Sequence, residues 1–380
     1  MLGCNTKRSA CILVIALGPV LSCVDAPEDD HGSLHNLPPI SWRGEYVEFG
    51  TDVETEICPQ TISSLDEYME AVSETVRSNT TYPIQYYYLR EDLDSYGFSC
   101  GGDALGCVNR VDGVKAIGSG RPSHRHELIH ASSSLRHRVL EEGLAVYLGT
   151  DLQWAGIADP LDIRAAFESV DSNNEFLPEE LYPVVGHFVS FLTDKYGLQR
   201  TVSLVEASEP GMTLAELVEL SVEHLGRDLR LDIDEYEVSG PGCEVAQFSP
   251  TWYECELVPP SIPIFTCDAD GDPVPIDISL SCDDGATGVQ EGEIWKDILV
   301  DAPTRVLTLI HLDEGHPVEF IVRSCGQGCS TPFSRVSSES TEPGLLLDAF
   351  YLEAGLNLIR IVKPVEAQGR VRFTIGMSCF

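Results

Sequence analysis

The segment HRHELIHASSSLRHRVLEEGLAVYLG, residues 124–149, decides how the rest of the chain is interpreted. Within it, His126, Glu127 and His130 form an HExxH sequence, and a pair of glutamates that ends at Glu142 follows. Residues four apart lie on one face of an α-helix, because one turn takes about 3.6 residues. The two imidazoles can therefore face one ion, and a glutamate from a second helix can join them. The segment predicts a metal centre; the alternative is a polar helix that is rich in such side chains by chance.

Two histidines and one carboxylate, with a fourth position left to water, form the ligand set of a catalytic zinc site and not of a closed structural one. The sequence therefore predicts that His126, His130 and Glu142 bind zinc (Zn2+). Zinc lowers the pKa of a bound water to about 7. Glu127 lies next to the ligands and can accept the proton of that water and pass it to a leaving amine. We expect Glu127 to be the general base of peptide-bond hydrolysis.

The sequences HELIHA and EGLAVYL, separated by a short spacer, resemble the gluzincin metallopeptidases, specifically their peptidase MA-like group. The resemblance covers residues 42–238 and implies a zincin-like fold. It implies that His126, His130 and Glu142 are zinc ligands and that the glutamate of the HExxH sequence is the base. Glu141 is the less favoured ligand of the two adjacent glutamates, because Gly-x-Ala follows Glu142.

A long helix expected at 181–197 is also similar to that group. The resemblance implies that Tyr182, at the start of this helix, donates a hydrogen bond to the tetrahedral oxyanion and is a catalytic residue. The alternative is a tyrosine that packs on the core. His187 lies on the same helix, and we expect it to be a satisfied or solvated histidine without a catalytic role.

The sequence departs from many gluzincins at Val146, four residues after the glutamate ligand, where those proteins carry an acid that orients a histidine. A partner for the histidines is therefore expected from elsewhere, for example a backbone carbonyl. His124 and His137 flank the motif, and we expect both to be surface residues. The serines at 132–134 are interpreted as the loop between two helices, since they do not lie within a G-x-S-x-G sequence.

The N-terminus has the pattern of an export signal. Two basic residues precede an apolar run at 10–21, which is too short for a stable membrane span. The run ends in VLSC, which resembles a bacterial lipobox whose cysteine carries lipid; the alternative is a plain secretory signal. The sequence thus predicts a lipoprotein signal peptide at 1–22, a lipid on Cys23 and an acidic tether at 23–40. We expect the protein to be exported, and either anchored by lipid in the bacterial cell envelope or extracellular.

Cysteine number agrees with export. Of the 13 cysteines, two fall in the signal peptide and one is assigned to lipid, which leaves ten. An even number in an oxidising compartment favours disulfides, whose connectivity the sequence leaves open. Plausible local pairs are Cys100–Cys107, Cys267–Cys282 and Cys325–Cys329.

The formal net charge of −37 repels nucleic acid and anionic lipid headgroups. Nucleic acid is therefore excluded as a partner, and membrane attachment is expected only through the lipid. An Asp-rich sequence at 267–273, CDADGDP, does not follow the EF-hand order and is interpreted as a β-turn and not as a calcium site.

Two domains are expected after the tether. Residues 41–240 are predicted to form the α+β zincin-like metallopeptidase domain, and residues 241–380 a disulfide-rich all-β sandwich. A strand near 112–120 is expected to be the edge strand that aligns substrate. Expected strands of the first domain are 42–52, 83–90 and 113–118, and expected helices are 61–77, 123–134, 139–148, 181–197 and 213–226.

The sequence therefore predicts an exported zinc metallopeptidase that acts on a peptide or protein substrate. The alternative is a catalytically inactive, zincin-like surface binding lipoprotein that works through its β domain. Metal analysis separates the two, because an enzyme of this kind holds one zinc ion per chain and a binding protein need not.

Overall fold

The computed structural model describes residues 34–378 with gaps. The segments left out within that range are 55–56, 77–79, 91, 99, 101–104, 112–113, 134–135, 150–161, 172–176, 240–254, 256–273, 284–286, 291, 303–305, 313–316, 326–332 and 339–344. The predictions for the signal peptide at 1–22, for the lipid on Cys23, for most of the tether and for the Asp-rich turn at 267–273 fall outside the described residues.

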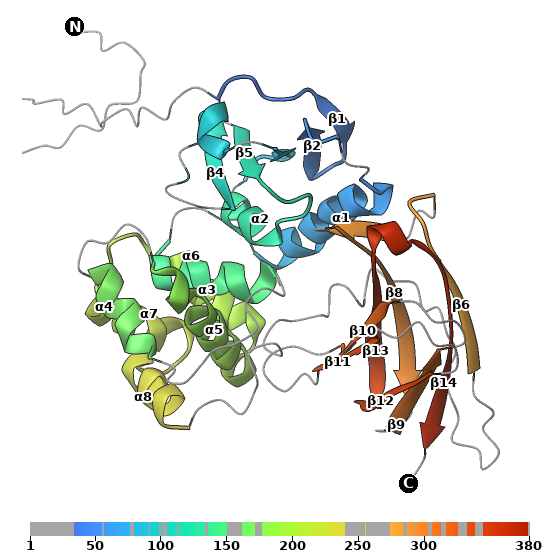
Figure 1. The fold of residues 1–380 in the computed structure, drawn as a ribbon. Helices are drawn as coiled ribbons and strands as arrows, with labels where there is room; N and C mark the ends of the chain where they lie inside the picture. The colour runs from blue at the N-terminus through green and yellow to red at the C-terminus, as the bar shows by residue number, and fades with distance from the viewer. Residues whose placement is uncertain are drawn as a thin grey trace, which may run out of the picture.

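The first half of the described chain is built on a five-stranded sheet. Its strands are β1 (Ile40–Arg43), β2 (Val47–Thr51), β3 (Ile84–Tyr88), β4 (Gly106–Val111) and β5 (Val114–Ser119). They lie in the order β1-β2-β3-β5-β4; β2, β3 and β5 are parallel, and the two outer strands are antiparallel to their neighbours (Figure 1). Helix α1 (Pro59–Thr75) joins β2 to β3 and buries Leu65, Met69 and Val72 in the core beneath the sheet.

The single strand expected at 42–52 is two strands joined by a tight turn. The N–H of Gly44 donates to the carbonyl of Val47 over 2.9 Å. The carboxylate of Asp66, on α1, accepts from the N–H groups of Tyr46 at 2.7 Å and Val47 at 2.8 Å. A side chain that is distant in sequence thus satisfies the backbone of the turn, and local alternation did not reveal it.

The edge of the sheet beside the helix that carries the HExxH sequence is β4, and the expectation that 112–120 forms it is wrong. β5 lies inside the sheet, between β3 and β4, and pairs with both. β4 lies outside the strands that the sequence predicts. Its Cys107 is bonded to Cys100, and its Asn109 side chain donates to the carbonyl of Gly97 over 3.4 Å. These cross-links hold a strand whose own sequence, GCVNRV, has weak strand character.

Eight α-helices lie within the described residues, so this half is mixed α/β. α2, α3, α5 and α7 agree with the expected helices, and Thr213 and Glu216 form a capping box at the start of α7. α4 and α6 were not expected as separate helices. The bounds are α2 Arg125–Ser132, α3 Arg138–Gly149, α4 Ile163–Asp171, α5 Tyr182–Tyr196, α6 Leu198–Ala207, α7 Leu214–His224 and α8 Leu229–Ser239.

Two glycines bring α3 close to its neighbours. A Cβ on Gly143 would lie 2.6 Å from Cγ2 of Val189 and 2.7 Å from the carbonyl oxygen of Val185, both on α5. A Cβ on Gly149 would lie 2.7 Å from Cα of His126, on α2. Because any larger residue would push these helices apart, Gly143 fixes the distance between α3 and α5. Gly149 fixes the distance between α3 and α2, the helices that carry the EGLA and HExxH sequences.

The second half of the described chain is all β, as expected. Two antiparallel sheets, with the orders β11-β10-β13-β8-β7 and β12-β9-β14-β6, share one core, in which Phe320 and Phe373 lie 5.0 Å apart between ring centroids. We call residues 274–378 the β region and residues 34–239 the α/β region. The strands are β6 Val274–Leu280, β7 Thr287–Gln290, β8 Glu293–Ala302, β9 Val306–Leu312, β10 Val318–Ser324, β11 Phe333–Ser338, β12 Leu345–Leu352, β13 Gly355–Pro364 and β14 Gly369–Ser378.

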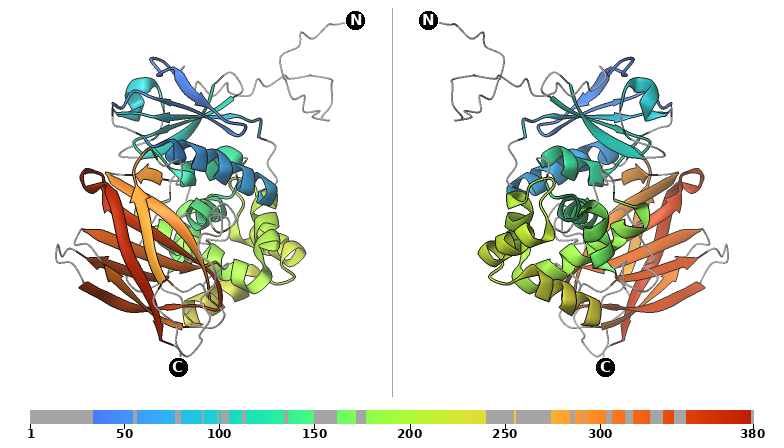
Figure 2. Two further views of the ribbon diagram at one scale, coloured as in Figure 1. Left: turned by 90° about the vertical axis from the view of Figure 1, so that its right-hand side faces the viewer. Right: turned by 90° about the vertical axis from the view of Figure 1, so that its left-hand side faces the viewer.

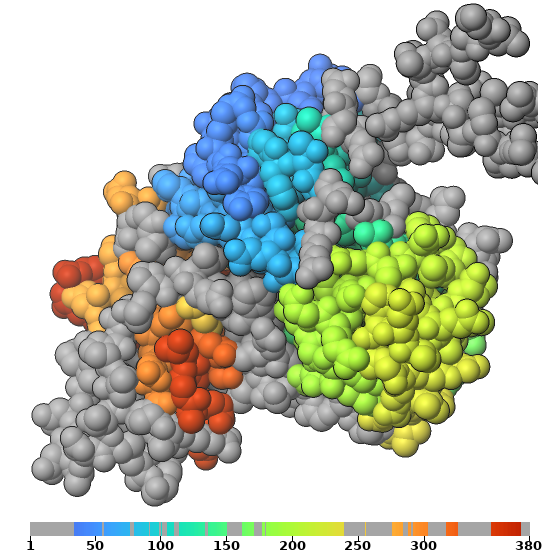
Figure 3. Space-filling view, turned by 180° about the vertical axis from the view of Figure 1, so that it is seen from behind, coloured from blue at the N-terminus to red at the C-terminus, as the bar shows by residue number. Residues whose placement is uncertain are grey.

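The two regions meet where α1 begins, beside β7. They also lie next to one another in the two views that are perpendicular to that of Figure 1 (Figure 2). Cys58 is bonded to Cys282, so the expected pair of Cys282 with Cys267 is wrong. The hydroxyl of Thr61 donates to the carbonyl of Val289 over 3.1 Å and accepts from its N–H over 2.7 Å. The start of α1 is thus tied to the β region by a disulfide to Cys282, in the turn after β6, and by two hydrogen bonds to Val289 on the edge strand β7. Figure 3 shows the α/β region and the β region from behind.

Of the other two predicted cysteine pairs, one is confirmed and one is wrong. The short-range pair Cys100–Cys107 is confirmed. The expected pair Cys325–Cys329 is wrong, because Cys325 is bonded to Cys255, 70 residues earlier. These disulfides suggest an oxidising environment, which agrees with the expected export. Among the described residues, no helix has the length and apolar character needed to cross a membrane.

Candidate metal centre

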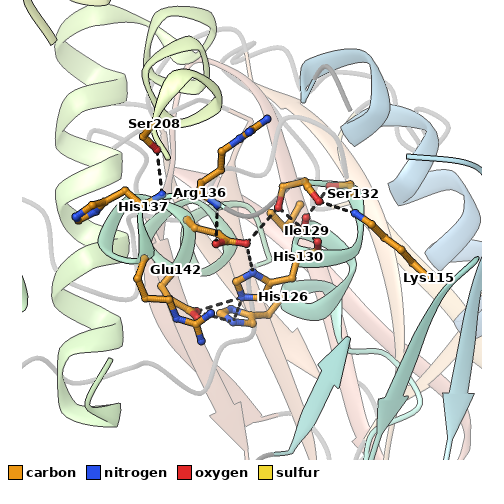
Figure 4. Close-up of polar contacts among 12 residues, drawn as sticks. Lys115, His126, Ile129, His130, Ser132, Arg136, His137, Glu142 and Ser208 are labelled. Atoms are coloured by element: carbon orange, nitrogen blue, oxygen red, sulfur yellow. Dashed lines mark hydrogen bonds and ion pairs between the residues drawn. The ribbon is translucent and has the colours of Figure 1, made fainter. Parts of the chain in front are cut away.

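The three predicted ligands converge on one point (Figure 4). Nε2 of His126 and Nε2 of His130 lie 3.0 Å apart, and each lies 3.2 Å from Oε2 of Glu142. Zinc bonds of about 2.0–2.1 Å in a tetrahedral site place ligand atoms roughly 3.3 Å apart. Three such atoms turned toward one another therefore fit a small divalent ion, although they do not identify the metal. Among the described residues, this is the group of histidine and acidic side chains that could hold one.

The end of α2 is held in place from the sheet. Nζ of Lys115, on β5, donates to the carbonyl of Ser133 over 2.5 Å. The hydroxyl of Thr80 lies 2.8 Å from the carbonyl oxygen of Ser132 and 3.1 Å from that of Ala131. The last carbonyls of a helix have no partner within it, so such donors satisfy them. This fixes the short helix that presents the two histidines.

Charge at the site is balanced between His130 and Glu142. Burial by itself raises the pKa of the Glu142 carboxyl, but His130 and His126 outweigh burial and hold that pKa well below its ordinary value. Burial by itself lowers the pKa of His130, but Glu142 and Glu141 raise it well above its ordinary value. Without a metal, the site is therefore built to hold a positive charge between carboxylates.

Glu141 supplies the partner that Val146 cannot. Its Oε1 lies 3.2 Å from Nδ1 of His130, the ring nitrogen that faces away from Glu142. The N–H of Arg136 donates to the other carboxylate oxygen over 3.3 Å. The expected backbone carbonyl is thus replaced by a carboxylate, as in many sites where a metal-binding histidine donates its second N–H to an acid. The only sequence signal was the adjacency of two glutamates.

Glu127 and Tyr182 lie at the site. The Glu127 side chain is buried, and a Cβ on Gly106 at the start of β4 would lie 2.8 Å from its Cγ. The ring of Tyr182 lies 5.9 Å from that of His126 between centroids. Burial, together with the nearby Glu142, raises the pKa of the Tyr182 phenol, which therefore stays protonated and can donate a hydrogen bond.

His124, His137 and His187 are buried, and the expectation that His124 and His137 lie at the surface is wrong. Nδ1 of His124 lies 3.3 Å from the hydroxyl of Ser119, and burial and the neighbouring His126 lower its pKa well below the usual value. The ring of His137 packs on Phe167. His187 is satisfied, as expected, with Nδ1 2.9 Å from the hydroxyl of Tyr236. His124 and His137 are buried because α2 and α3 pack against the sheet and the neighbouring helices. No local pattern in the sequence encodes that packing.

Comparison with known proteins adds little. No protein-family model matches the chain, and no curated protein matches it significantly. A similar solved structure is the GH26-CBM35 β-(1,4)-mannanase of Podospora anserina, with 16% identity over 28% of this chain and 28% of that chain and a TM-score of 0.19. Another is HEPD of Streptomyces albus with 2-hydroxyethylphosphonate and Fe(II) bound, with 16% identity over 62% of this chain and 46% of that chain and a TM-score of 0.14. This chain thus spans less than half of either structure, and similarities this weak support no conclusion about function.

Proposed function

We propose that the protein is an exported zinc metallopeptidase of the gluzincin type, with a zincin-like domain, a β-sandwich domain and a lipid anchor on Cys23. The convergence of His126, His130 and Glu142 carries the proposal. A bound zinc ion supplies a Lewis acid that polarises a carbonyl oxygen and lowers the pKa of a water molecule. The donor set of two imidazoles and one carboxylate fits zinc and leaves room for that water.

The surrounding side chains have the properties that peptide hydrolysis requires. Glu127 adjoins the ligands, and we assign to it the removal of a proton from water and its delivery to the leaving amine nitrogen. Tyr182 is a neutral phenol beside the histidines, and we assign to it a hydrogen bond to the oxyanion that develops on the scissile carbonyl.

The edge strand β4 offers a way to align an extended peptide. The N–H of Gly120 donates to the carbonyl of Leu105, which sets the alternation of the antiparallel β4–β5 ladder. By that alternation, Gly106 and Val108 turn their N–H and C=O groups away from β5. Gly106 also lies against Glu127. A peptide that pairs with this edge would bring its backbone past the proposed base.

The decisive test uses protein that was purified without chelator. We expect about one zinc per chain, and cleavage of an unbiased peptide mixture that a chelator stops and added zinc restores. Glu127→Gln should keep the zinc and lower activity by about 10²–10⁴-fold, since it removes only proton transfer. Glu219→Gln, at an exposed position of α7, is the matched control and should retain both. Full activity of Glu127→Gln would reject the mechanism.

One observation favours the inactive binding protein as a second candidate. Nδ1 of His126 is buried and has no hydrogen-bond partner among the described residues, whereas metal-binding histidines nearly always have one. Protein without zinc, whose melting temperature does not rise when zinc is added, would support this alternative.

A further inference from the structure

Arg138 contacts one of the two oxygens of the Glu142 carboxylate and leaves the other to the histidines. Its Nη2 lies 2.5 Å from Oε1, while Oε2 faces the two histidines at 3.2 Å from each Nε2. The Glu142 side chain is 1% exposed, so its carboxylate has no access to water that would compensate for a lost partner. The two oxygens therefore have different roles, since one is held by the guanidinium and the other is directed at the metal position.

Helix stability does not explain an arginine at this place. Arg138 is the first residue of α3, where a cation faces the positive end of the helix dipole. The acid lies four residues after the base, which is the less favourable order for such a pair. The dipole effect opposes the arrangement by a few tenths of a kcal/mol and the ion pair in this order returns little, so we look for the benefit of the pair outside the helix.

The same guanidinium also contacts Tyr182. The hydrogen bond between the two side chains, and the charge of Arg138, counter the rise that burial causes in the pKa of the phenol. An arginine has donors and no acceptor, so the phenol oxygen accepts this bond and directs its own hydrogen elsewhere. Arg138 therefore contacts both the carboxylate ligand and the proposed oxyanion donor.

We propose that Arg138 is a positioning residue that reserves Oε1 of Glu142, so that Glu142 offers a metal a single oxygen, and that holds Tyr182 beside it. The inference rests on the proposed metal centre. A carboxylate that binds through one oxygen leaves a position open for water, whereas one that binds through both fills it. The planar guanidinium, which donates in two directions at once, suits this role better than an ammonium.

The test replaces zinc by cobalt(II), whose visible absorption reports coordination geometry without any enzyme assay. In Arg138→Met, we expect the visible bands to weaken as Glu142 gains a second contact with the metal. We expect the dissociation constant for zinc to rise by about 10–100-fold. In Arg138→Lys, we expect a metal affinity between wild type and Arg138→Met, with kcat lowered more than KM because Tyr182 loses its partner.

Arg164→Met is the matched control. Arg164 lies at the start of α4 and pairs with Asp234 and Glu237 on a half-exposed surface away from the ligands. Its cobalt spectrum and zinc affinity should equal those of wild type. If Arg138→Met does not fold, Arg138→Lys decides alone: a wild-type spectrum and wild-type kinetics would overturn the proposal. Wild-type cobalt spectra in a folded Arg138→Met would overturn it as well. A wild-type protein that binds no zinc would overturn the metal centre and this inference together.

Discussion

The two histidines of the HExxH sequence have very different surroundings. His130 is contacted on both ring nitrogens, by Glu141 at Nδ1 and by Glu142 at Nε2. His126 reaches the same carboxylate through Nε2, but its Nδ1 is buried without a partner among the described residues. A ring that is held on both sides keeps its orientation, and a ring that is held on one side can adjust. The difference teaches that α3, and not α2 alone, fixes the geometry of the site.

The largest expected effect comes from removing each ring in turn. His130→Ala removes the charged partner of Glu141 and leaves Glu142 with Arg138 and His126 alone, so we expect loss of zinc and of stability by about 3–5 kcal/mol. His126→Ala should also abolish tight zinc binding but cost less stability, because Glu141 and Glu142 both keep His130. Zinc titration and thermal unfolding of both variants test this. Equal losses of stability would contradict the asymmetry.

The next effect concerns Glu141. Glu141→Ala should weaken zinc binding by about 10–100-fold, since the Nδ1–H of His130 loses its acceptor. Glu141→Gln keeps an acceptor oxygen without the charge and should fall between wild type and Glu141→Ala. Competition with a chromogenic chelator measures both constants. Wild-type affinity in Glu141→Ala would show that His130 is no better anchored than His126.

A smaller effect is expected from Gly149, which packs against the backbone of His126. A methyl group there would lie 2.7 Å from Cα of His126, so Gly149→Ala must displace the start of α2 or the end of α3. Overpacking of this kind costs about 1–3 kcal/mol. We expect a lower midpoint of urea unfolding, with zinc affinity reduced less than in Glu141→Ala. Gly197→Ala is not a suitable control for the loss of a glycine, because Gly197 has a φ of 85° that alanine adopts only with strain.

The smallest effect is a dependence of stability on pH in metal-free protein. The raised pKa of His130 contributes stability below its ordinary value near 6.5, and this is lost as pH rises through the raised value. The lowered pKa of Glu142 contributes stability above its ordinary value, and this is lost as pH falls through the lowered value. The melting temperature should therefore decline on the alkaline side in chelator.

Two variants separate the histidines in that measurement. His130→Gln should flatten the alkaline decline, because the titrating group is gone. His126→Gln should keep it, because both glutamates still flank His130. Calorimetric melting curves over a range of pH provide the comparison. An alkaline decline that persists in His130→Gln would assign it to another group.

Part of the site could be predicted from helical spacing. His126 and His130 are four residues apart, and that alone places them on one face. Glu142 was chosen over Glu141 through the resemblance of EGLAVYL to the gluzincins, and its carboxylate lies beside the two imidazoles. Helical periodicity also predicted the helix at 213–226, which α7 matches.

What could not be predicted depends on distant packing. The roles of Glu141 and Arg138 require knowing how α2 and α3 face each other, which no spacing within one helix states. The burial of His124 and His137 has the same cause. Cys58–Cys282 joins residues 224 positions apart, so closeness in sequence suggested the wrong partner for Cys282.

That long-range disulfide has a consequence for what happens when a protease cuts the chain. Any single cut of the chain between residues 58 and 282 leaves the two fragments on one covalent molecule, because the bond closes that stretch into a ring. The HExxH sequence and the EGLA sequence both lie inside the ring. The nicked form would therefore run as one band on a gel until reductant is added, and its two pieces would stay together at any dilution.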